Sequence, residues 1–212
     1  MDVTGGIFRI FSFLNWIMRL AYVQLLWIVF TVLGLGIFGL FPATNAMFAM
    51  IRKWLSGKDI PVFPFMWKTY RREFMKANLH FYTLLLIGGI IYFYFKLFQN
   101  QTSIFFAILT ILLFIIAIFY CFSVTIAMAV HTHYELRLRS FLTIVFYTVI
   151  RYPFHMITIG VIHVLFYFLI TAIPGLVPFF SISILALAVM FVMNLVFDKM
   201  DEKQIVLNNQ NS

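Results

Sequence analysis

The chain has 212 residues, of which 64% are hydrophobic and only 10% are charged, and its mean hydropathy is +1.02. A water-soluble chain carries about 25% charged residues, so this composition excludes a soluble globular domain. A membrane crossing takes about 20 apolar residues, which leaves room for about five or six crossings and for no separate catalytic domain. The formal net charge of +8 does not indicate a nucleic-acid partner, because the basic residues lie between apolar runs, as they do in cytoplasmic loops.

The apolar runs predict an all-α, polytopic transmembrane helical bundle that forms a single domain over residues 1–198. We expect five full spans and one short crossing or half-helix, because a helix over residues 42–55 would reach only about 21 Å. Cytoplasmic amphipathic helices should lie between the spans, and a polar cytoplasmic tail should follow over residues 199–212. The spans are expected at about residues 8–36, 42–55 (the short one), 79–98, 104–130, 154–173 and 179–197.

Glycine and proline residues interrupt the chain after the first apolar run. Gly34, Gly36 and Gly39 are followed by Pro42, whose missing N–H costs nothing if Pro42 opens a new helix. We therefore predict a structural hinge at Gly39 and Pro42, where two helix ends meet in a sharp reversal.

The positions of Lys and Arg predict the orientation in a cell membrane. Basic residues gather in 56–78, 131–153 and the tail, whereas the turns 97–103 and 174–178 contain none. Because Lys and Arg are retained on the cytoplasmic side, the three basic stretches and the C-terminus are expected inside. The N-terminus is inside if 42–55 crosses the membrane and outside if it does not.

Residues 64–78 predict an amphipathic helix with an aromatic face and a basic stripe. Three aromatic residues recur at three- and four-residue intervals, and three basic residues recur every four residues on another face. Such a helix lies flat in the headgroup layer, where each Lys or Arg near anionic lipid adds about 1 kcal/mol. The segment is therefore either a membrane-interface anchor on anionic headgroups or a docking surface for a cytoplasmic partner. Its candidate residues are Trp67, Lys68, Tyr70, Arg71, Arg72, Phe74 and Lys76.

Few polar groups lie within the predicted spans. On a helix, His131 and Glu135 would stand one turn apart, but two ligands do not make a zinc site. His163 lies deep in a span, where a lone histidine usually forms a hydrogen bond between helices. No Asp or Glu lies inside any predicted span, so a proton relay or sodium site has no ligand. We expect no catalytic residues, no metal site and no cofactor, and the chain is not expected to be an enzyme.

The stretch 39–57 resembles a motif of the YesL-like membrane proteins. Its Pro-Ala-Thr turn at 42–44 and its basic segment Arg-Lys-Trp-Leu-Ser-Gly at 52–57 are similar to that family, as is the aromatic-basic segment that follows. The resemblance covers nearly the whole chain. It implies an uncharacterised integral membrane protein of Gram-positive bacteria, often encoded beside carbohydrate ABC importers and polysaccharide-degrading enzymes.

The resemblance implies a non-enzymatic accessory subunit of a carbohydrate (oligosaccharide) ABC importer, with ABC permease subunits as candidate partners. Small residues at Gly88 and Gly89 and within 123–129 would supply the helix–helix seam. A self-contained small transporter or channel is the alternative, and it requires polar groups that converge at mid-membrane. A membrane-bound regulator or assembly factor is a third hypothesis, because the cytoplasmic stretches are the conspicuous polar surfaces.

Overall fold

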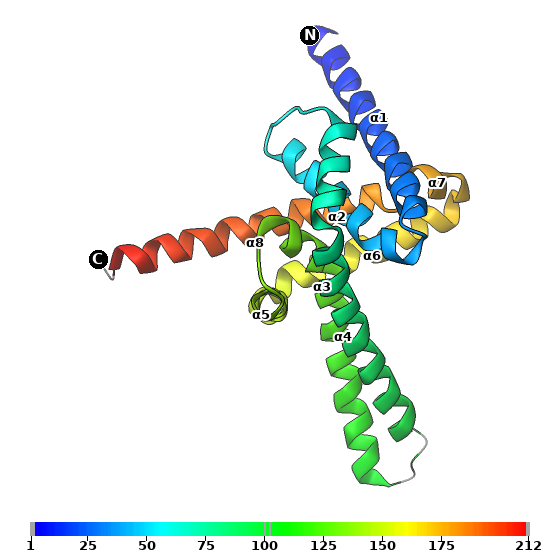
Figure 1. The fold of residues 1–212 in the computed structure, drawn as a ribbon, viewed down its shortest axis with the longest axis vertical. Helices are drawn as coiled ribbons and strands as arrows, with labels where there is room; N and C mark the ends of the chain where they lie inside the picture. Colours follow the sequence, from blue (N-terminus) through cyan, green and yellow to red (C-terminus); the bar gives the residue numbers. More distant parts are fainter. Residues whose placement is uncertain (1–2, 100, 102, 211–212) are drawn as a thin grey trace.

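The computed structural model describes residues 3–99, 101 and 103–210, and all secondary structure in this part of the chain is helical. This confirms the predicted all-α class. Figure 1 shows the helices in chain order. They are α1 (Val3–Leu33), α2 (Ile37–Leu55), α3 (Val62–Gln99), α4 (Ile104–His133), α5 (Leu138–Arg151), α6 (Pro153–Ala172), the 3-10 turn η1 (Pro174–Leu176), α7 (Val177–Phe180) and α8 (Ser183–Gln210).

Five helices are long and apolar enough to cross a membrane, as the composition predicts for a multi-pass membrane protein. They are Leu14–Leu33 of α1, the helices α3, α4 and α6, and Ser183–Glu202 of α8. The helix α2, which contains the predicted short crossing, does not belong to this group. It is instead the central helix, because it contacts α1, α3, α4 and α8, and ten of its 19 residues are buried.

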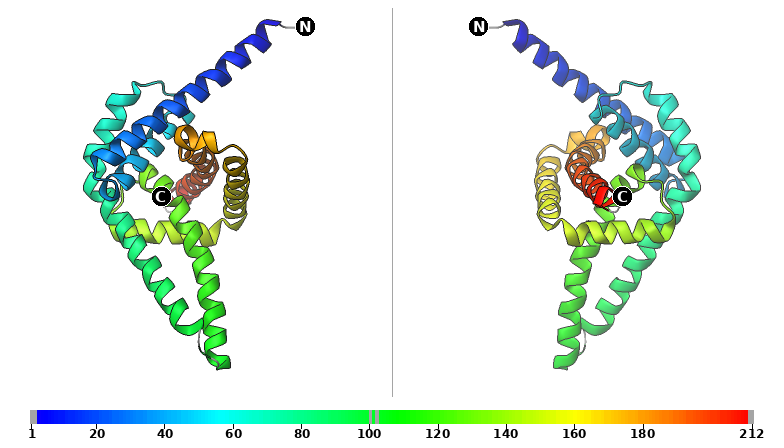
Figure 2. Two further views of the ribbon diagram at one scale, coloured as in Figure 1. Left: turned by 90° about the vertical axis from the view of Figure 1, so that its right-hand side faces the viewer. Right: turned by 90° about the vertical axis from the view of Figure 1, so that its left-hand side faces the viewer.

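Two helical hairpins leave this central packing. The far half of the α3–α4 hairpin projects from the rest of the molecule in Figure 1 and in both views of Figure 2. No residue in the most apolar window of α4 is buried by the chain itself. The second hairpin joins α6 to α8 through η1 and α7, at the tight turn that its two prolines and glycine predict. The short helix α5 lies across the base of the body between α4 and α6 (Figure 2).

Only one of the two predicted amphipathic segments is a separate helix. α5 is a 14-residue helix that buries Phe141, Val145, Thr148 and Val149. Residues 64–78, by contrast, form the first half of the 38-residue helix α3 and continue without a break into the predicted span. At about 1.5 Å per residue α3 reaches about 57 Å, so only part of it fits in a hydrocarbon core of about 30 Å. Its basic first half is the part that extends beyond the core.

The chain reverses three residues before Gly39, which corrects the predicted hinge. Leu35 and Gly36 have positive φ angles of 58° and 73°, and α2 already begins at Ile37. Two successive left-handed residues turn the chain more tightly than a proline at the start of a helix does. Gly39 and Pro42 therefore lie inside α2. Gly39 still marks the contact of the two helices, because a Cβ on Gly39 would meet the backbone of α1.

Pro42 is tolerated inside α2 because α3 supplies the missing hydrogen bond. Proline has no N–H for the carbonyl four residues earlier, which is that of Phe38. The Asn78 side chain of α3 donates its amide N–H to this carbonyl at 3.0 Å. The Tyr82 hydroxyl donates to the adjacent carbonyl of Ile37 at 3.1 Å. The proline thus fixes the register between α2 and α3.

Candidate functional site

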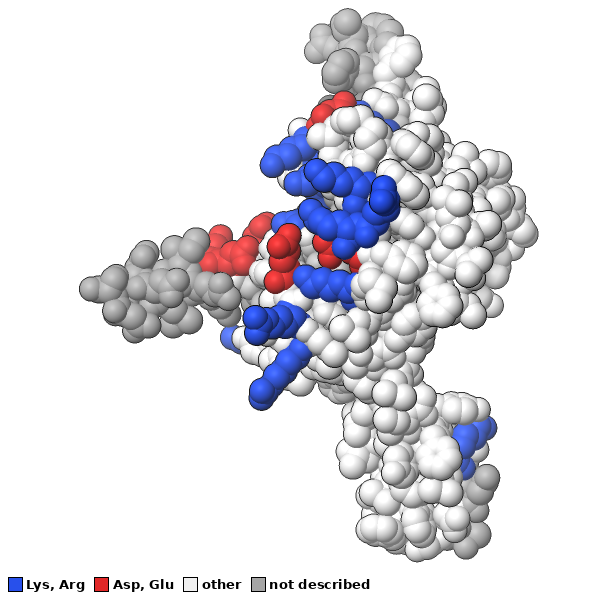
Figure 3. All heavy atoms as spheres, viewed as in Figure 1, with Lys and Arg blue, Asp and Glu red and all other residues white. Residues whose placement is uncertain are grey.

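Most of the charged side chains of the described residues gather on one side of the molecule. In Figure 3 they cover the end of α2, the first half of α3, and the neighbouring parts of α5 and α8, while most of the remaining surface in this view is uncharged. The two basic stretches that the sequence separates, 56–78 and 131–153, therefore share one face. This arrangement is the one expected if both stretches lie on the same side of a membrane.

The aromatic face of residues 64–78 packs inside the molecule. Tyr70 is only 5% exposed, and its ring centroid lies 5.2 Å from that of Phe30 in α1. Trp67 lies 5.5 Å from Phe30 and stacks on Tyr70, and Phe74 meets Tyr70 edge-on. The expectation that this face lies in the headgroup layer is wrong for Tyr70, because α1 already covers it.

The basic residues of the same segment divide into two groups. Lys68 and Arg71 are exposed, and the Arg71 guanidinium lies 5.8 Å from the Trp67 ring. Arg72, which is also exposed, and the half-buried Lys76 line a groove between α2, α3 and α4. Whether Lys68 and Arg71 bind lipid headgroups or a partner stays a prediction.

This groove, which we call the α2–α4 groove, consists of two adjoining cavities. The larger has a volume of about 290 Å³ and is lined by Ala49, Arg52, Lys53, Phe65, Thr69, Arg72, Thr132, His133 and Glu135. The smaller, of about 60 Å³, shares five of these residues and adds Asn45, Glu73, Lys76 and His131. The groove therefore combines cationic, carboxylate, hydroxyl, amide and imidazole groups from three helices.

A buried pair of histidines lies behind the smaller cavity. The Nδ1 atoms of His80 and His131 are 2.8 Å apart, so one nitrogen donates a proton and the other accepts it. The Nε2 atom of His131 faces a carboxylate oxygen of Glu73 at 3.7 Å. This separation is too long for a hydrogen bond, and Nε2 of His131 has no hydrogen-bond partner among the described residues. Glu73 accepts a hydrogen bond from Arg72 at 2.7 Å.

Arg52 forms the other wall of the α2–α4 groove. Its guanidinium donates to the carbonyl of Thr132 at 2.6 Å, near the end of α4. Burial lowers the pKa of Arg52, and the negative charge of Asp201 offsets this in part. Asp201 accepts a hydrogen bond from the Tyr134 hydroxyl at 3.2 Å and lies 3.5 Å from His133. Burial and Asp201 together raise the pKa of Tyr134, which keeps this hydroxyl protonated as a donor.

The histidine predictions require two corrections. α4 ends at His133, so Glu135 is not on a helix with His131, and the carboxylate that faces His131 is Glu73. Glu73 lies in the first half of α3, before the predicted span 79–98. His163 bonds the carbonyl of Ile159 in its own helix at 2.8 Å instead of joining two helices. Within the described residues, no group of three or more His, Cys, Asp or Glu side chains could hold a metal ion.

Sequence reasoning missed several residues of the groove, among them Asn45 and Thr69. Asn45 is 2% exposed and Thr69 is 5% exposed, yet both line the smaller cavity. The available signal was the spacing of Asn45, Ala49, Arg52 and Lys53, which places them on one face of α2.

Comparison with known proteins found one matching family and several similar proteins. Residues 20–95 match the sequence family described as "Protein of unknown function, DUF624". The chain is 36% identical to "Uncharacterized protein YteU" of Bacillus subtilis (strain 168) over 208 residues, which cover 95% of this chain and 91% of that protein. It belongs to the YesL-like family of Gram-positive bacteria.

Two further Bacillus subtilis relatives of this YesL-like chain bear the same description. "Uncharacterized protein YesV" is 37% identical over 184 residues, covering 82% of this chain and 85% of the relative. "Uncharacterized protein YesL" is 32% identical over 142 residues, covering 66% of each chain. No solved structure matches the chain.

Proposed function

We propose that this YesL-like protein is a non-enzymatic membrane subunit that packs against another helical membrane protein, namely the permease of a carbohydrate ABC importer. The observation that carries the proposal is the projecting α3–α4 hairpin, which the rest of the chain leaves uncovered (Figures 1 and 2). A pair of apolar helices that projects from the packed body offers a lateral surface to a partner in the bilayer.

Small residues decide which face of the hairpin fits a partner helix. Most of the seam expected from the sequence is used within the chain, since Tyr120 fills the space beside Gly88, and Ser123, Ala127 and Ala129 are buried. Gly89 is different, because it is exposed and a Cβ there would meet nothing within 4 Å. Its neighbours on the same helix face, Leu86 and Phe93, are more than 60% exposed. Gly89 is therefore a notch in which a partner helix can approach closely.

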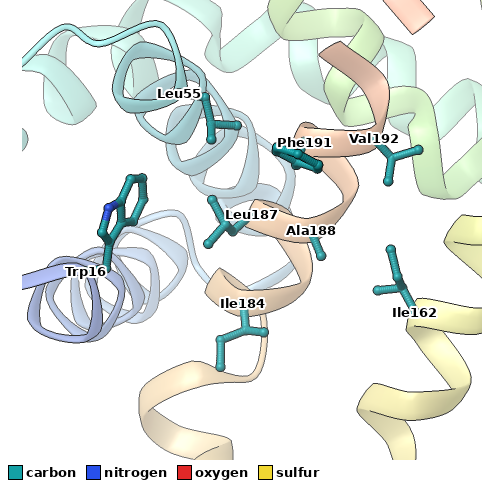
Figure 4. Close-up of a pocket in the computed structure, with 8 residues that line it drawn as sticks. All are labelled: Trp16, Leu55, Ile162, Ile184, Leu187, Ala188, Phe191 and Val192. Carbon is teal, nitrogen blue, oxygen red and sulfur yellow. The ribbon is translucent and has the colours of Figure 1, made fainter. Parts of the chain in front are cut away.

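A self-contained transporter has less support from the described residues. A cavity with a volume of about 410 Å³ lies between α1, α2, α6 and α8. Its walls are apolar side chains, as Figure 4 shows for Trp16, Ile162 and Leu187 and their neighbours. A path for a polar solute needs hydrogen-bonding groups along its walls, and this cavity offers almost none.

Purification from the native host in a mild detergent tests the proposal. We expect mass spectrometry to identify a permease pair that co-purifies with the parent chain. Gly89→Leu, which fills the notch but keeps the helix apolar, should reduce recovery of the permease. Ala107→Leu is the matched control on the exposed surface of α4 and should not reduce it. A lone homo-oligomer, or equal recovery with both variants, would contradict the proposal.

A further inference from the structure

The charge balance of the α2–α4 groove indicates that it binds an anion. Three cationic side chains line the larger cavity, Arg52, Lys53 and Arg72, against the single carboxylate of Glu135. Of these cations, only Arg72 forms an ion pair within the part of the chain that the structure describes. Arg52 is half-buried and bonds only a neutral carbonyl. Asp201 lies close enough to influence Arg52 but forms no ion pair with it, so these partly desolvated cations still favour an incoming anion.

The floor of the groove adds a requirement for a hydrogen-bond donor. The side-chain oxygen of Asn45 is buried and has no hydrogen-bond partner among the described residues, although Asn45 is only 2% exposed. The Nδ1 atom of His133 is likewise buried and has no hydrogen-bond partner among the described residues. Because the Nε2 atom of His133 faces Asp201, Nε2 carries the proton and Nδ1 is an acceptor. Buried acceptors without partners are rare in folded proteins. A hydroxyl group, which has one O–H donor, would satisfy either of them.

We propose that the α2–α4 groove binds a phosphate ester that carries a hydroxyl group. The phosphate oxygens would lie among Arg52, Lys53 and Arg72, since cations from two directions suit a tetrahedral anion and Arg binds it through a planar fork. The hydroxyl would reach the smaller cavity at Asn45, whose volume of about 60 Å³ admits a group of that size. The source is either the headgroup of a glycerophospholipid or a soluble phosphate ester, and this site does not depend on the partner proposed above.

Two probes test the site on the full-length protein purified in a neutral detergent. The soluble probe is glycerol 1-phosphate, titrated by calorimetry, with methyl phosphate as the analogue that lacks the hydroxyls. The lipid probe is phosphatidylglycerol against phosphatidylcholine in nanodiscs, with retained lipid counted by native mass spectrometry. We expect the parent to bind glycerol 1-phosphate more tightly than methyl phosphate, or to retain phosphatidylglycerol in preference to phosphatidylcholine.

Matched variants locate the binding. Lys53→Gln removes a cation from the groove and should weaken binding about tenfold or more, because a charge-assisted hydrogen bond is lost. Lys68→Gln removes the same charge from an exposed position outside the groove and should change affinity less than about twofold. Asn45→Leu keeps the number and branching of the side-chain heavy atoms and removes the unpaired amide oxygen, so it should fold and should abolish the preference for the hydroxylated probe.

The arms of the experiment separate the two sources. Retention of phosphatidylglycerol without binding of glycerol 1-phosphate identifies a lipid headgroup, and binding of the soluble probe identifies a free phosphate ester. Failure of the parent to bind either probe would overturn the proposal. Equal weakening by Lys53→Gln and Lys68→Gln would also overturn it, because the effect would then be one of general surface charge. Arg72→Gln adds a second groove variant, although it also breaks the pair with Glu73.

Discussion

The close contact between the ends of α1 and α2 makes Gly39 sensitive to a single added methyl group. A Cβ at residue 39 would lie 2.8 Å from the carbonyl oxygen of Phe30 and 2.9 Å from the Cα of Gly34, and closer still to the carbonyl oxygen of Thr31. All three are backbone atoms of the α1 end, so no side-chain rotation relieves the clash. Gly39→Ala should therefore force α1 away from α2.

Gly89 provides the matched control for this substitution. Both glycines lie inside helices, so alanine gains the same helix propensity, up to about 1 kcal/mol, at each. A Cβ at residue 89 meets nothing within 4 Å. The difference between Gly39→Ala and Gly89→Ala thus isolates the clash, for which overpacking data give about 1–3 kcal/mol. At roughly 2–4 °C per kcal/mol for a chain of this size, Gly39→Ala should unfold about 2–12 °C below Gly89→Ala.

Thermal unfolding in detergent, followed by tryptophan fluorescence, measures this difference. Both variants must first elute from size exclusion at the position of the parent. Equal unfolding midpoints for the two alanine variants would show that the ends of α1 and α2 do not meet at residue 39.

Three further predictions follow from the same geometry. Asn78→Leu should destabilise the protein by about 1–2 kcal/mol in chemical denaturation, because the Phe38 carbonyl loses its donor. Adding Pro42→Ala should recover this loss, because alanine restores a backbone N–H; no recovery would contradict the pairing of Asn78 with Phe38. The charge-conserving double variant Arg71→Lys with Arg72→Lys should leave expression intact and weaken recovery of the permease, because Lys cannot bind a carboxylate through two parallel N–H groups as Arg does. If this variant recovers as much permease as the parent does, while the double Gln variant fails, the segment is a lipid anchor instead. To test the membrane orientation, single cysteines are placed at Ser56, Gln101, Ser140 or Gly175 in a Cys121→Ser background. On intact cells an impermeant thiol reagent should label only the cysteines at Gln101 and Gly175.

The long apolar helices could be predicted from the sequence because hydrophobic length is a local property. Runs of about 20 apolar residues predict spans whatever surrounds them, and five such helices are present. Boundaries were harder where the pattern changed without a helix breaker. No Gly or Pro lies between Pro64 and Gly88, so α3 continues from its amphipathic half into its apolar half. The change from an amphipathic to an apolar pattern near residue 79 was interpreted as a helix boundary, but α3 continues through it and only the surroundings of the helix change.

The contacts across helices could not be predicted, because they join residues far apart in the sequence. An aromatic face on residues 64–78 has the same periodicity whether it meets headgroups or Phe30, and the structure shows Phe30. His131 was paired with Glu135, the nearest acid in the sequence, whereas the structure pairs it with Glu73 on another helix. The pairing of Asn78 with the carbonyl freed by Pro42 depends likewise on the packing of α2 against α3.

The helix α2 explains why the fold and the candidate site are linked. Its opposite face packs on α1, where Thr44 accepts a hydrogen bond from Trp27 at 2.8 Å. The polar face with Asn45, Arg52 and Lys53 forms one wall of the α2–α4 groove. These polar residues weaken the apolar character of α2, a helix long enough to be considered as a span. Burying the polar side of a helix costs free energy unless its polar groups are hydrogen-bonded or its charges are paired. The ambiguity of residues 42–55 in the sequence and the position of the groove therefore have the same cause.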